Sequence, residues 1–191
     1  MSKEKELKPS LNDLKKELKR EKSKTEYKKV LRNTLYVVVI VAALAVLISS
    51  FYITVLRVTG DSMTPTLETG QIVIAQNSST FEPGELIAFY YNNKVLVKRV
   101  VGSPGDWINI DNDGNVSVNG ELLDEPYAEK SFDPTDIKFP YQVPENRYFV
   151  LGDHRSASID SRSSVVGCVT REQLIGKVIF RVFPFNVSGG L

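Results

Sequence analysis

The spacing of apolar residues along the chain predicts three successive parts. Up to residue 33, isolated apolar residues recur among many charged ones, and an uncharged, mostly apolar run then extends to residue 56. From residue 57 onward, short apolar runs alternate with clusters of Gly, Pro, Asn and Asp. We therefore expect a tail (residues 1–33), an apolar span (34–56) and a folded domain (57–191).

The apolar span is long enough to cross a bilayer. The uncharged run over residues 33–56 exceeds the length of about 20 apolar residues that a membrane-crossing helix needs. Tyr36, Phe51 and Tyr52 lie near its ends, as aromatic residues at membrane interfaces do. A cleaved signal peptide would have a shorter apolar region nearer the N-terminus. A buried core helix is the alternative, and we expect a single transmembrane helix over 34–56.

The tail is rich in Lys, Glu and Leu, and four of its leucines recur at helical spacing. This pattern predicts a basic, helical segment. Such a segment is either solvated or lies on anionic lipid or against a partner, and the sequence leaves both readings open. The four leucines are Leu7, Leu11, Leu14 and Leu18.

The residues after 56 have the pattern of strands and turns, which is typical of a mainly β domain. Asn119-Gly120 between two apolar runs predicts a hairpin over residues 116–123. We also expect a surface loop at 124–146, one helical turn at 171–174 and a loose tail at 187–191. The other expected strands are residues 71–75, 85–91, 95–101, 107–110, 148–151 and 177–183.

The net charge of +1 conceals two segments of opposite sign. Residues 1–33 hold 12 Lys and Arg against 6 Asp and Glu, whereas residues 57–191 hold 12 against 17. A nucleic-acid-binding protein would carry positive charge on its folded part, so we exclude that class. Basic residues beside a membrane span stay on the cytoplasmic side, which predicts a cytoplasmic N-terminus and an extracytoplasmic domain in the cell membrane.

Cysteine and histidine are too few for a disulfide framework or a Cys/His metal cluster. Cys168 is the one cysteine and His154 the one histidine. Residues 111–115 (Asp-Asn-Asp-Gly-Asn) resemble the start of a calcium loop but lack its later acidic ligands, so we interpret them as a turn.

The segment Val58–Leu67 (VTGDSMTPTL) follows the span closely and carries a candidate nucleophile, Ser62. A serine hydroxyl attacks an amide only with a base within hydrogen-bond reach and with donors aimed at the oxyanion that forms. An ordinary turn serine is the alternative, because serines are common in turns.

Lys98 is the candidate base. In the segment 95–101 (VLVKRVV), a period of two places Lys98 on the same face as Leu96 and Val100. Loss of hydration on an apolar face lowers the pKa of a lysine, and the neutral amine can then accept a proton from serine. A lysine that reaches solvent from a strand edge is the alternative. Arg99 points to the other face, where we expect a structural ion pair.

Residues 152–162 (GDHRSASIDSR) form the third candidate piece. Two carboxylates, two arginines and three serines within eleven residues suit either a turn with internal Arg–Asp pairs or a loop that supports a site. His154 would also allow a Ser62–His154–Asp triad. We disfavour that triad because the adjacent Asp153 cannot readily orient the imidazole.

These three pieces, in this order, resemble the type I signal peptidase family in its Gram-positive-like bacterial form. The resemblance covers about residues 34–185 and consists of a membrane anchor followed by GDSMTPTL, KRVVGSPGD and GDHRSASIDSR. It implies a mainly β, signal-peptidase-type catalytic domain after a single N-terminal transmembrane helix. It also implies a serine endopeptidase that removes signal peptides from exported preproteins through a Ser/Lys pair, without a cofactor.

The resemblance further implies roles for individual residues. Ser62 would be the nucleophile, Lys98 the general base and Ser158 the hydroxyl that orients Lys98. The Ser62 backbone N–H would serve the oxyanion hole, and Gly60 stands where some family members carry an additional hydroxyl. Structural support would come from Arg99, Asp153, Asp160 and Arg162. Shallow pockets for small substrate residues at −1 and −3 would be lined by Val58, Met63, Leu67 and Val97.

Two positions depart from the family pattern. His154 stands where the family usually has asparagine, and Val165 stands where it usually has glycine, with Gly167 two residues later. The shape of the loop at 163–167 is therefore open, although no implied catalytic residue is lost. The middle insert is short, which predicts a compact domain.

Two other functions remain open at this point. One is a related Ser/Lys peptidase dedicated to a single substrate, and the other is a non-catalytic, membrane-anchored β module that binds a partner. The partners that the resemblance implies are preproteins, the lipid bilayer and the secretion machinery.

The charge pattern makes a prediction about topology. A protease added outside intact cells or protoplasts should digest residues 57–191 and spare residues 1–33, because the basic tail stays inside. Immunoblotting with antibodies against each segment would measure this. A digested tail with a protected domain would reverse the orientation.

Overall fold

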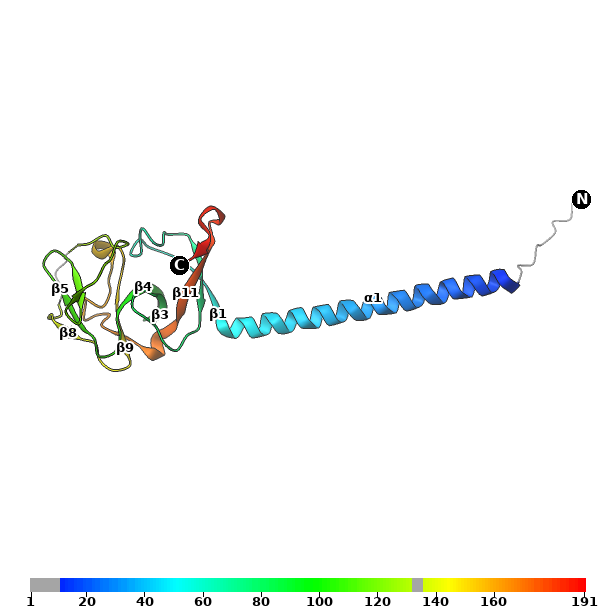
Figure 1. Cartoon of the computed structure of the whole chain (residues 1–191), viewed down its shortest axis with the longest axis horizontal. Helices are drawn as coiled ribbons and strands as arrows, with labels where there is room; N and C mark the ends of the chain where they lie inside the picture. The colour runs from blue at the N-terminus through cyan, green and yellow to red at the C-terminus, as the bar shows by residue number, and fades with distance from the viewer. Residues whose placement is uncertain (1–10, 132–135) are drawn as a thin grey trace, which may run out of the picture. The chain divides into compact units, whose positions relative to one another are not determined.

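The computed structural model describes residues 11–131 and 136–191. It contains two compact units, Met1–Ser49 and Ser50–Leu191, and Figure 1 shows the long helix of the first and the strands of the second. Each unit is taken by itself below.

Helix α1 (Leu11–Tyr52) joins much of the tail and the apolar span in one element. Its 42 residues would extend over roughly 60 Å at 1.5 Å per residue, about twice the hydrocarbon thickness of a bilayer. Within it, Leu14–Tyr52 is long and apolar enough to cross a membrane. The helix predicted for the tail is thus confirmed from residue 11 onward, whereas Leu7 lies outside the described residues.

The helix ends four residues before the predicted end of the span. Residues Ile53–Arg57 instead form strand β1, which pairs antiparallel with β2 (Ile72–Gln76). The run Ile53-Thr54-Val55 is β-branched throughout, and such residues favour a strand when a partner edge is available.

The larger sheet holds the elements that position the site. Its strand order is β1-β2-β11-β3-β4-β9-β10. Strand β12 pairs with β11 but is not part of this order. The central strands are antiparallel, so residues from distant parts of the chain meet across it. The remaining bounds are β3 (Leu86–Tyr91), β4 (Lys94–Gly102), β9 (Arg147–Leu151), β10 (Val169–Thr170), β11 (Leu174–Phe183) and β12 (Gly189–Gly190).

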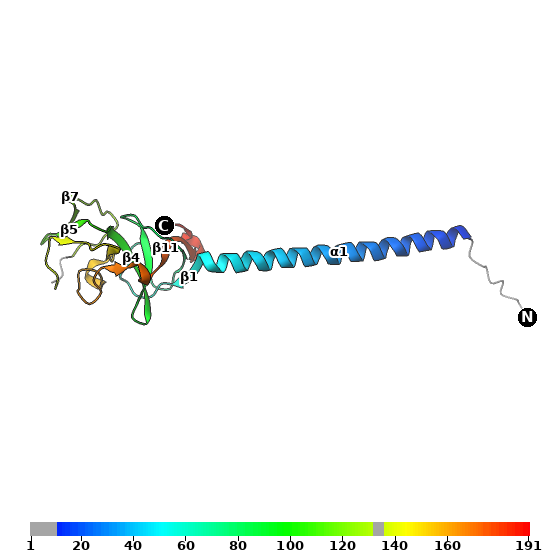
Figure 2. The same ribbon diagram turned by 90° about the horizontal axis from the view of Figure 1, so that it is seen from below.

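A smaller sheet with the order β7-β6-β5-β8 lies at the end of the second unit away from β1 (Figures 1 and 2). Its strands are β5 (Trp107–Ile110), β6 (Val116–Val118), β7 (Glu121–Leu122) and β8 (Tyr141–Gln142). Asn119 and Gly120 join β6 to β7 with φ values of 55° and 87°, as a two-residue hairpin turn requires. The predicted hairpin is confirmed.

Three apolar clusters fill the β-rich unit. The first contains Met63 and Leu67, which follow Ser62 in the candidate nucleophile segment and are 2% and 0% exposed. Burying two such side chains contributes roughly 1.5–3 kcal/mol each, so the segment between β1 and β2 is fixed to the core.

Two predicted loop regions prove more ordered than expected. Residues 124–146 were expected to form a surface loop, but β8 pairs with β5 and Glu125 is 3% exposed. The tail at 187–191 was expected to be loose, but β12 pairs with β11 after a 3-10 turn at Phe185–Val187. Most described residues of 124–146 lie outside strands as predicted, but β8 was missed because its partners in β5 are 33 and 35 positions away. The tail prediction was wrong because β12 consists of two glycines and has no strand pattern of its own. The turn expected at 171–174 is confirmed as a capped 3-10 turn, Arg171–Gln173.

Candidate active site

Ser62 lies in a tight turn between β1 and β2. The Asp61 carbonyl accepts hydrogen bonds from the Thr64 N–H (3.1 Å) and from Thr64 Oγ1 (2.8 Å), which close the turn around the serine. The Ser62 carbonyl accepts a bond from the His154 N–H at 3.2 Å. The turn is therefore attached both to itself and to the segment after β9.

Lys98 extends from β4 to Ser62, with Nζ 2.6 Å from Oγ. The residue is 2% exposed, and its strand register pairs it with Ile87, which is 0% exposed. Burial lowers the pKa of Lys98 from 10.5 to about 8, and the carboxylates of Asp160 and Asp153 oppose this only in part. A neutral amine at this distance can take the serine proton directly.

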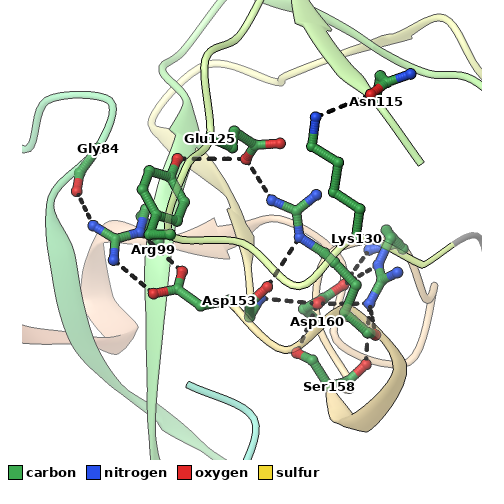
Figure 3. Close-up of polar contacts among 12 residues, drawn as sticks. Gly84, Arg99, Asn115, Glu125, Lys130, Asp153, Ser158 and Asp160 are labelled. Atoms are coloured by element: carbon green, nitrogen blue, oxygen red, sulfur yellow. Dashed lines mark hydrogen bonds and ion pairs between the residues drawn. The ribbon is translucent and has the colours of Figure 1, made fainter. Parts of the chain in front are cut away.

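Arg99 follows Lys98 on β4 and makes the ion pair that the alternation predicted. Its Nε and Nη2 donate to the two carboxylate oxygens of Asp153 at 2.9 and 2.6 Å (Figure 3). Thr66 Oγ1 donates to the same carboxylate at 2.5 Å, and the guanidinium lies 3.9 Å from the centre of the Tyr127 ring. These contacts connect β4, the nucleophile segment and the segment after β9.

Asp160 gathers a second set of donors around one buried carboxylate (Figure 3). Its Oδ2 accepts from the Gly152 N–H at 3.0 Å, from Ser158 Oγ at 2.7 Å and from Arg162 Nη2 at 3.0 Å. Arg162 also donates to the Arg155 carbonyl at 2.6 Å. In the structure the Ser158 hydroxyl thus donates to Asp160, and no hydrogen bond between Ser158 and Lys98 is formed among the described residues.

Gly152 is a positioning residue that the sequence did not reveal. A Cβ atom there would lie 2.2 Å from Ser158 Oγ and 2.6 Å from the Ser62 carbonyl oxygen. Any side chain would push these two groups apart. It opens the GDHRSASIDSR motif immediately after a buried strand, but no role was predicted for it.

A further ion pair missing from the predictions joins Arg155 to Glu125 (Figure 3). Arg155 is 2% exposed and also donates to the Gly152 carbonyl at 3.0 Å. Because both charges are buried, removing one partner would leave the other uncompensated. The pair fixes the 3-10 turn at Arg155–Ala157 to the segment around Glu125.

The ring of His154 contacts Thr64 and Glu129 and not the Ser62 hydroxyl. Its Nδ1 lies 3.0 Å from Thr64 Oγ1, and its Nε2 lies 3.5 Å from Glu129 Oε2. This geometry does not support a Ser62–His154–Asp triad, since the base position beside Ser62 Oγ is taken by Lys98.

A pocket of about 480 Å³ adjoins Ser62 between the β1 end and the start of β4. Three of the four residues that the resemblance implied line it, namely Val58, Met63 and Val97. Leu67 does not line this pocket and is packed beneath it in the first apolar cluster.

The Ser62 N–H faces no hydrogen-bond acceptor in the part of the chain that the structure describes, which leaves it open to an oxyanion. Gly60 lines the pocket with φ of 85°, a backbone conformation that favours glycine, and offers no side-chain donor.

The loop at 163–167 closes through Gly167. Its φ is 60°, and its N–H donates to the Ser163 carbonyl at 2.8 Å. Val165 is 67% exposed in this loop. The residue with positive φ, where glycine is favoured, is Gly167 and not residue 165.

The segment 111–115 is a turn as predicted. Asp111 Oδ1 accepts from the N–H groups of Asp113 and Asn115 at 2.9 and 2.8 Å. Within residues 11–131 and 136–191 no group of three or more His, Cys, Asp or Glu side chains is placed to hold a metal ion.

Comparison with known proteins gives one consistent match. Residues 31–183 fit the family model described as signal peptidase, peptidase S26. The chain is 34% identical to Signal peptidase I of Bacillus amyloliquefaciens over 88% of this chain and 97% of that protein. It is 36% identical to Signal peptidase I S of Bacillus subtilis (strain 168), over 78% and 87%. A crystal structure of a signal peptidase I from Enterococcus faecalis V583 matches 51% of this chain and 96% of its own, with 28% identity and a TM-score of 0.43.

Because Lys98 is buried, replacing it with an apolar residue should increase the free energy of unfolding. Lowering its pKa from 10.5 to about 8 corresponds to a cost of roughly 3 kcal/mol at pH values where the lysine is protonated in both folded and unfolded states. Lys98→Met should remove this cost and lose one hydrogen bond of about 1 kcal/mol. Below pH 8 the variant should therefore be more stable than wild type by roughly 2 kcal/mol.

The extra stability of Lys98→Met over wild type should decrease as pH rises from 8 to 10.5. In this range the lysine is mostly neutral in the folded wild type but still protonated in the unfolded chain, so rising pH stabilises the wild type. Urea unfolding of the full chain in detergent, followed by Trp107 fluorescence, measures it. Lys138→Met, at an exposed position, is the control and should show no pH-dependent gain. A Lys98→Met variant less stable than wild type at neutral pH would contradict the burial cost.

Proposed function

The chain belongs to the peptidase S26 family of signal peptidases, and on this premise we propose that it removes N-terminal signal peptides from exported preproteins as a membrane-bound serine endopeptidase. The observation that carries the proposal is the 2.6 Å contact between Lys98 Nζ and Ser62 Oγ. A buried amine and a turn serine so placed make an activated nucleophile without histidine.

In the proposed reaction, neutral Lys98 takes the proton of Ser62 as Oγ attacks the scissile carbonyl. The Ser62 N–H donates to the oxyanion that forms. Protonated Lys98 then gives its proton to the leaving amine, so the C–N bond breaks and an ester between Ser62 and the signal peptide remains. Water, deprotonated by Lys98, hydrolyses that ester.

Ser158 is proposed to orient Lys98. Its one hydroxyl proton is already donated to Asp160 Oδ2 at 2.7 Å, so its oxygen can only accept a further hydrogen bond. An N–H of Lys98 is the donor we assign to it, which would direct the amine lone pair at Ser62. Arg99, Asp153, Asp160 and Arg162 support this arrangement through the ion pairs described above.

For the substrate, we propose that Val58, Met63 and Val97 contact small side chains at −1 and −3 in the pocket beside Ser62. Leu67 supports that pocket from beneath.

The proposed topology keeps residues 1–33 in the cytoplasm, the span 34–56 in the cell membrane and the catalytic domain 57–191 outside. The basic charge of the tail supports this orientation. Preproteins emerging from the secretion machinery would then meet the site on the outer face.

Single and double substitutions of the Ser/Lys pair should be equally damaging. Ser62→Ala and Lys98→Ala should each abolish cleavage of a preprotein, and the double variant should be no worse than either, because the two act as a unit. Mass analysis of the products from purified protein in detergent gives the cut site and the rate. A panel of unrelated preproteins distinguishes a general enzyme from one with a single substrate.

His154→Ala provides the contrast in the same assay. It keeps the backbone bond to the Ser62 carbonyl and should lose far less activity than Lys98→Ala. An inactive His154→Ala beside an active Lys98→Ala would overturn the proposed base.

The pH dependence follows from the lowered pKa of Lys98, about 8. Because the base works only when neutral, activity should rise through mildly alkaline pH and not through a limb near ~6.5, where an ordinary histidine titrates. Ser158→Ala should lower turnover by roughly 10- to 1000-fold, the range for one lost orienting or stabilising hydrogen bond, and keep the alkaline limb.

A pH–rate profile of wild type and Ser158→Ala on one peptide measures both effects. An unchanged rate in Ser158→Ala would remove this residue from the site, and a wild-type limb near ~6.5 would point to histidine.

A further inference from the structure

A second pocket, of about 370 Å³, opens on the other side of the nucleophile turn. The pocket beside Ser62 described above includes Met63 but no residue beyond it on the turn, whereas this one begins at Thr64. A peptide crossing Ser62 with its signal-peptide side in the first pocket would continue toward the second. The second pocket is lined by Thr64, Pro65, Pro126, Tyr127, Ala128 and Glu129.

Backbone hydrogen bonds fix this pocket relative to Ser62. The Glu129 N–H donates to the Asp153 carbonyl at 2.8 Å, and the Glu129 carbonyl accepts from the Arg155 N–H at 3.1 Å. Between them, the His154 N–H donates to the Ser62 carbonyl at 3.2 Å.

Glu129 is thus about two strand spacings, roughly 10 Å, from the nucleophile backbone. An extended peptide advances about 3.3 Å per residue, so its first three residues after the scissile bond come within reach.

The hydrogen-bond network defines which atoms of His154 face Glu129. Thr64 Oγ1 donates its proton to the Asp61 carbonyl, so it accepts from His154 Nδ1, which carries the ring proton. In a neutral imidazole the Nε2 atom then has only a lone pair, and it lies 3.5 Å from Glu129 Oε2.

With the imidazole neutral, two acceptors therefore face each other: the carboxylate of Glu129, which lines the pocket, and His154 Nε2 beside it. Glu129 is the only carboxylate among the described residues that line it, and its side chain is 66% exposed. The nearby acids Asp153 and Glu125 are already paired with Arg99 and Arg155. A cationic group with several N–H donors would satisfy both acceptors at once.

We propose that this second pocket binds a lysine or arginine side chain from the first three residues of the mature protein, on the leaving-group side of the scissile bond. The prolines, Ala128 and the Tyr127 ring contact the aliphatic stem, and the charged end lies between Glu129 and His154 Nε2. This proposal rests on the proposed function and adds a preference for charge after the cleavage site.

The test uses peptides that share one signal-peptide cleavage region. A reference peptide carries Ala at the three positions after the cut, and each position is replaced in turn by Lys or Glu. Wild type should prefer Lys to Glu at one of these positions by about 3- to 10-fold in kcat/KM, as expected for a partly exposed ion pair. The preference should decrease with added salt.

Glu129→Lys should reverse the ratio, because the rim then carries the opposite charge and the backbone bonds of residue 129 remain. Glu121→Lys is the matched control, since Glu121 is an exposed residue of β7, and its ratio should equal that of wild type. A Lys:Glu ratio that is equal in all three enzymes overturns the proposal, and so does a reversal in both variants. A reference peptide that wild type leaves uncut would refute the proposed function instead.

Discussion

The burial of Lys98 against Ser62 is the constraint around which the β-rich unit is arranged. A lysine in an apolar interior is unstable as a cation, so the fold loses part of its stability in holding a base whose pKa is about 8. The same burial creates the need for the surrounding charge network. Asp153 and Asp160 lie close enough to raise the Lys98 pKa, and Arg162, which is paired with Asp160, lowers it. Asp153 is paired with Arg99.

That network also restricts how the segments of the site can be arranged. Arg99, Arg155 and Arg162 come from β4 and from the segment after β9, and each is paired with a buried carboxylate. Buried ion pairs contribute little net stability but are costly to break singly, so they favour one arrangement over its alternatives. Gly152 adds a steric constraint, because only a residue without Cβ leaves room for Ser158 and the Ser62 carbonyl beside its backbone.

Local patterns in the sequence predicted those features whose residues lie on a single strand or hairpin. The alternation around Lys98 indicated a buried lysine with Arg99 on the opposite face, and the Asn119-Gly120 dipeptide indicated a hairpin. The roles of Glu125 and Glu129 could not be predicted, because residues 124–146 have the composition of a loop and their partners lie some 25–30 positions away. Strand β1 was missed because its β-branched residues continue the apolar run of the span.

Cys168 packs in the second apolar cluster and lies 3.9 Å from the Tyr141 hydroxyl, and burial raises the pKa of its thiol. A thiol that is buried and protonated reacts slowly with oxidants and alkylating agents. With no second cysteine in the chain, the fold depends on packing and pairing alone. Within this sequence no disulfide can form, so a change in the redox state of the surroundings neither makes nor breaks a cross-link between its residues.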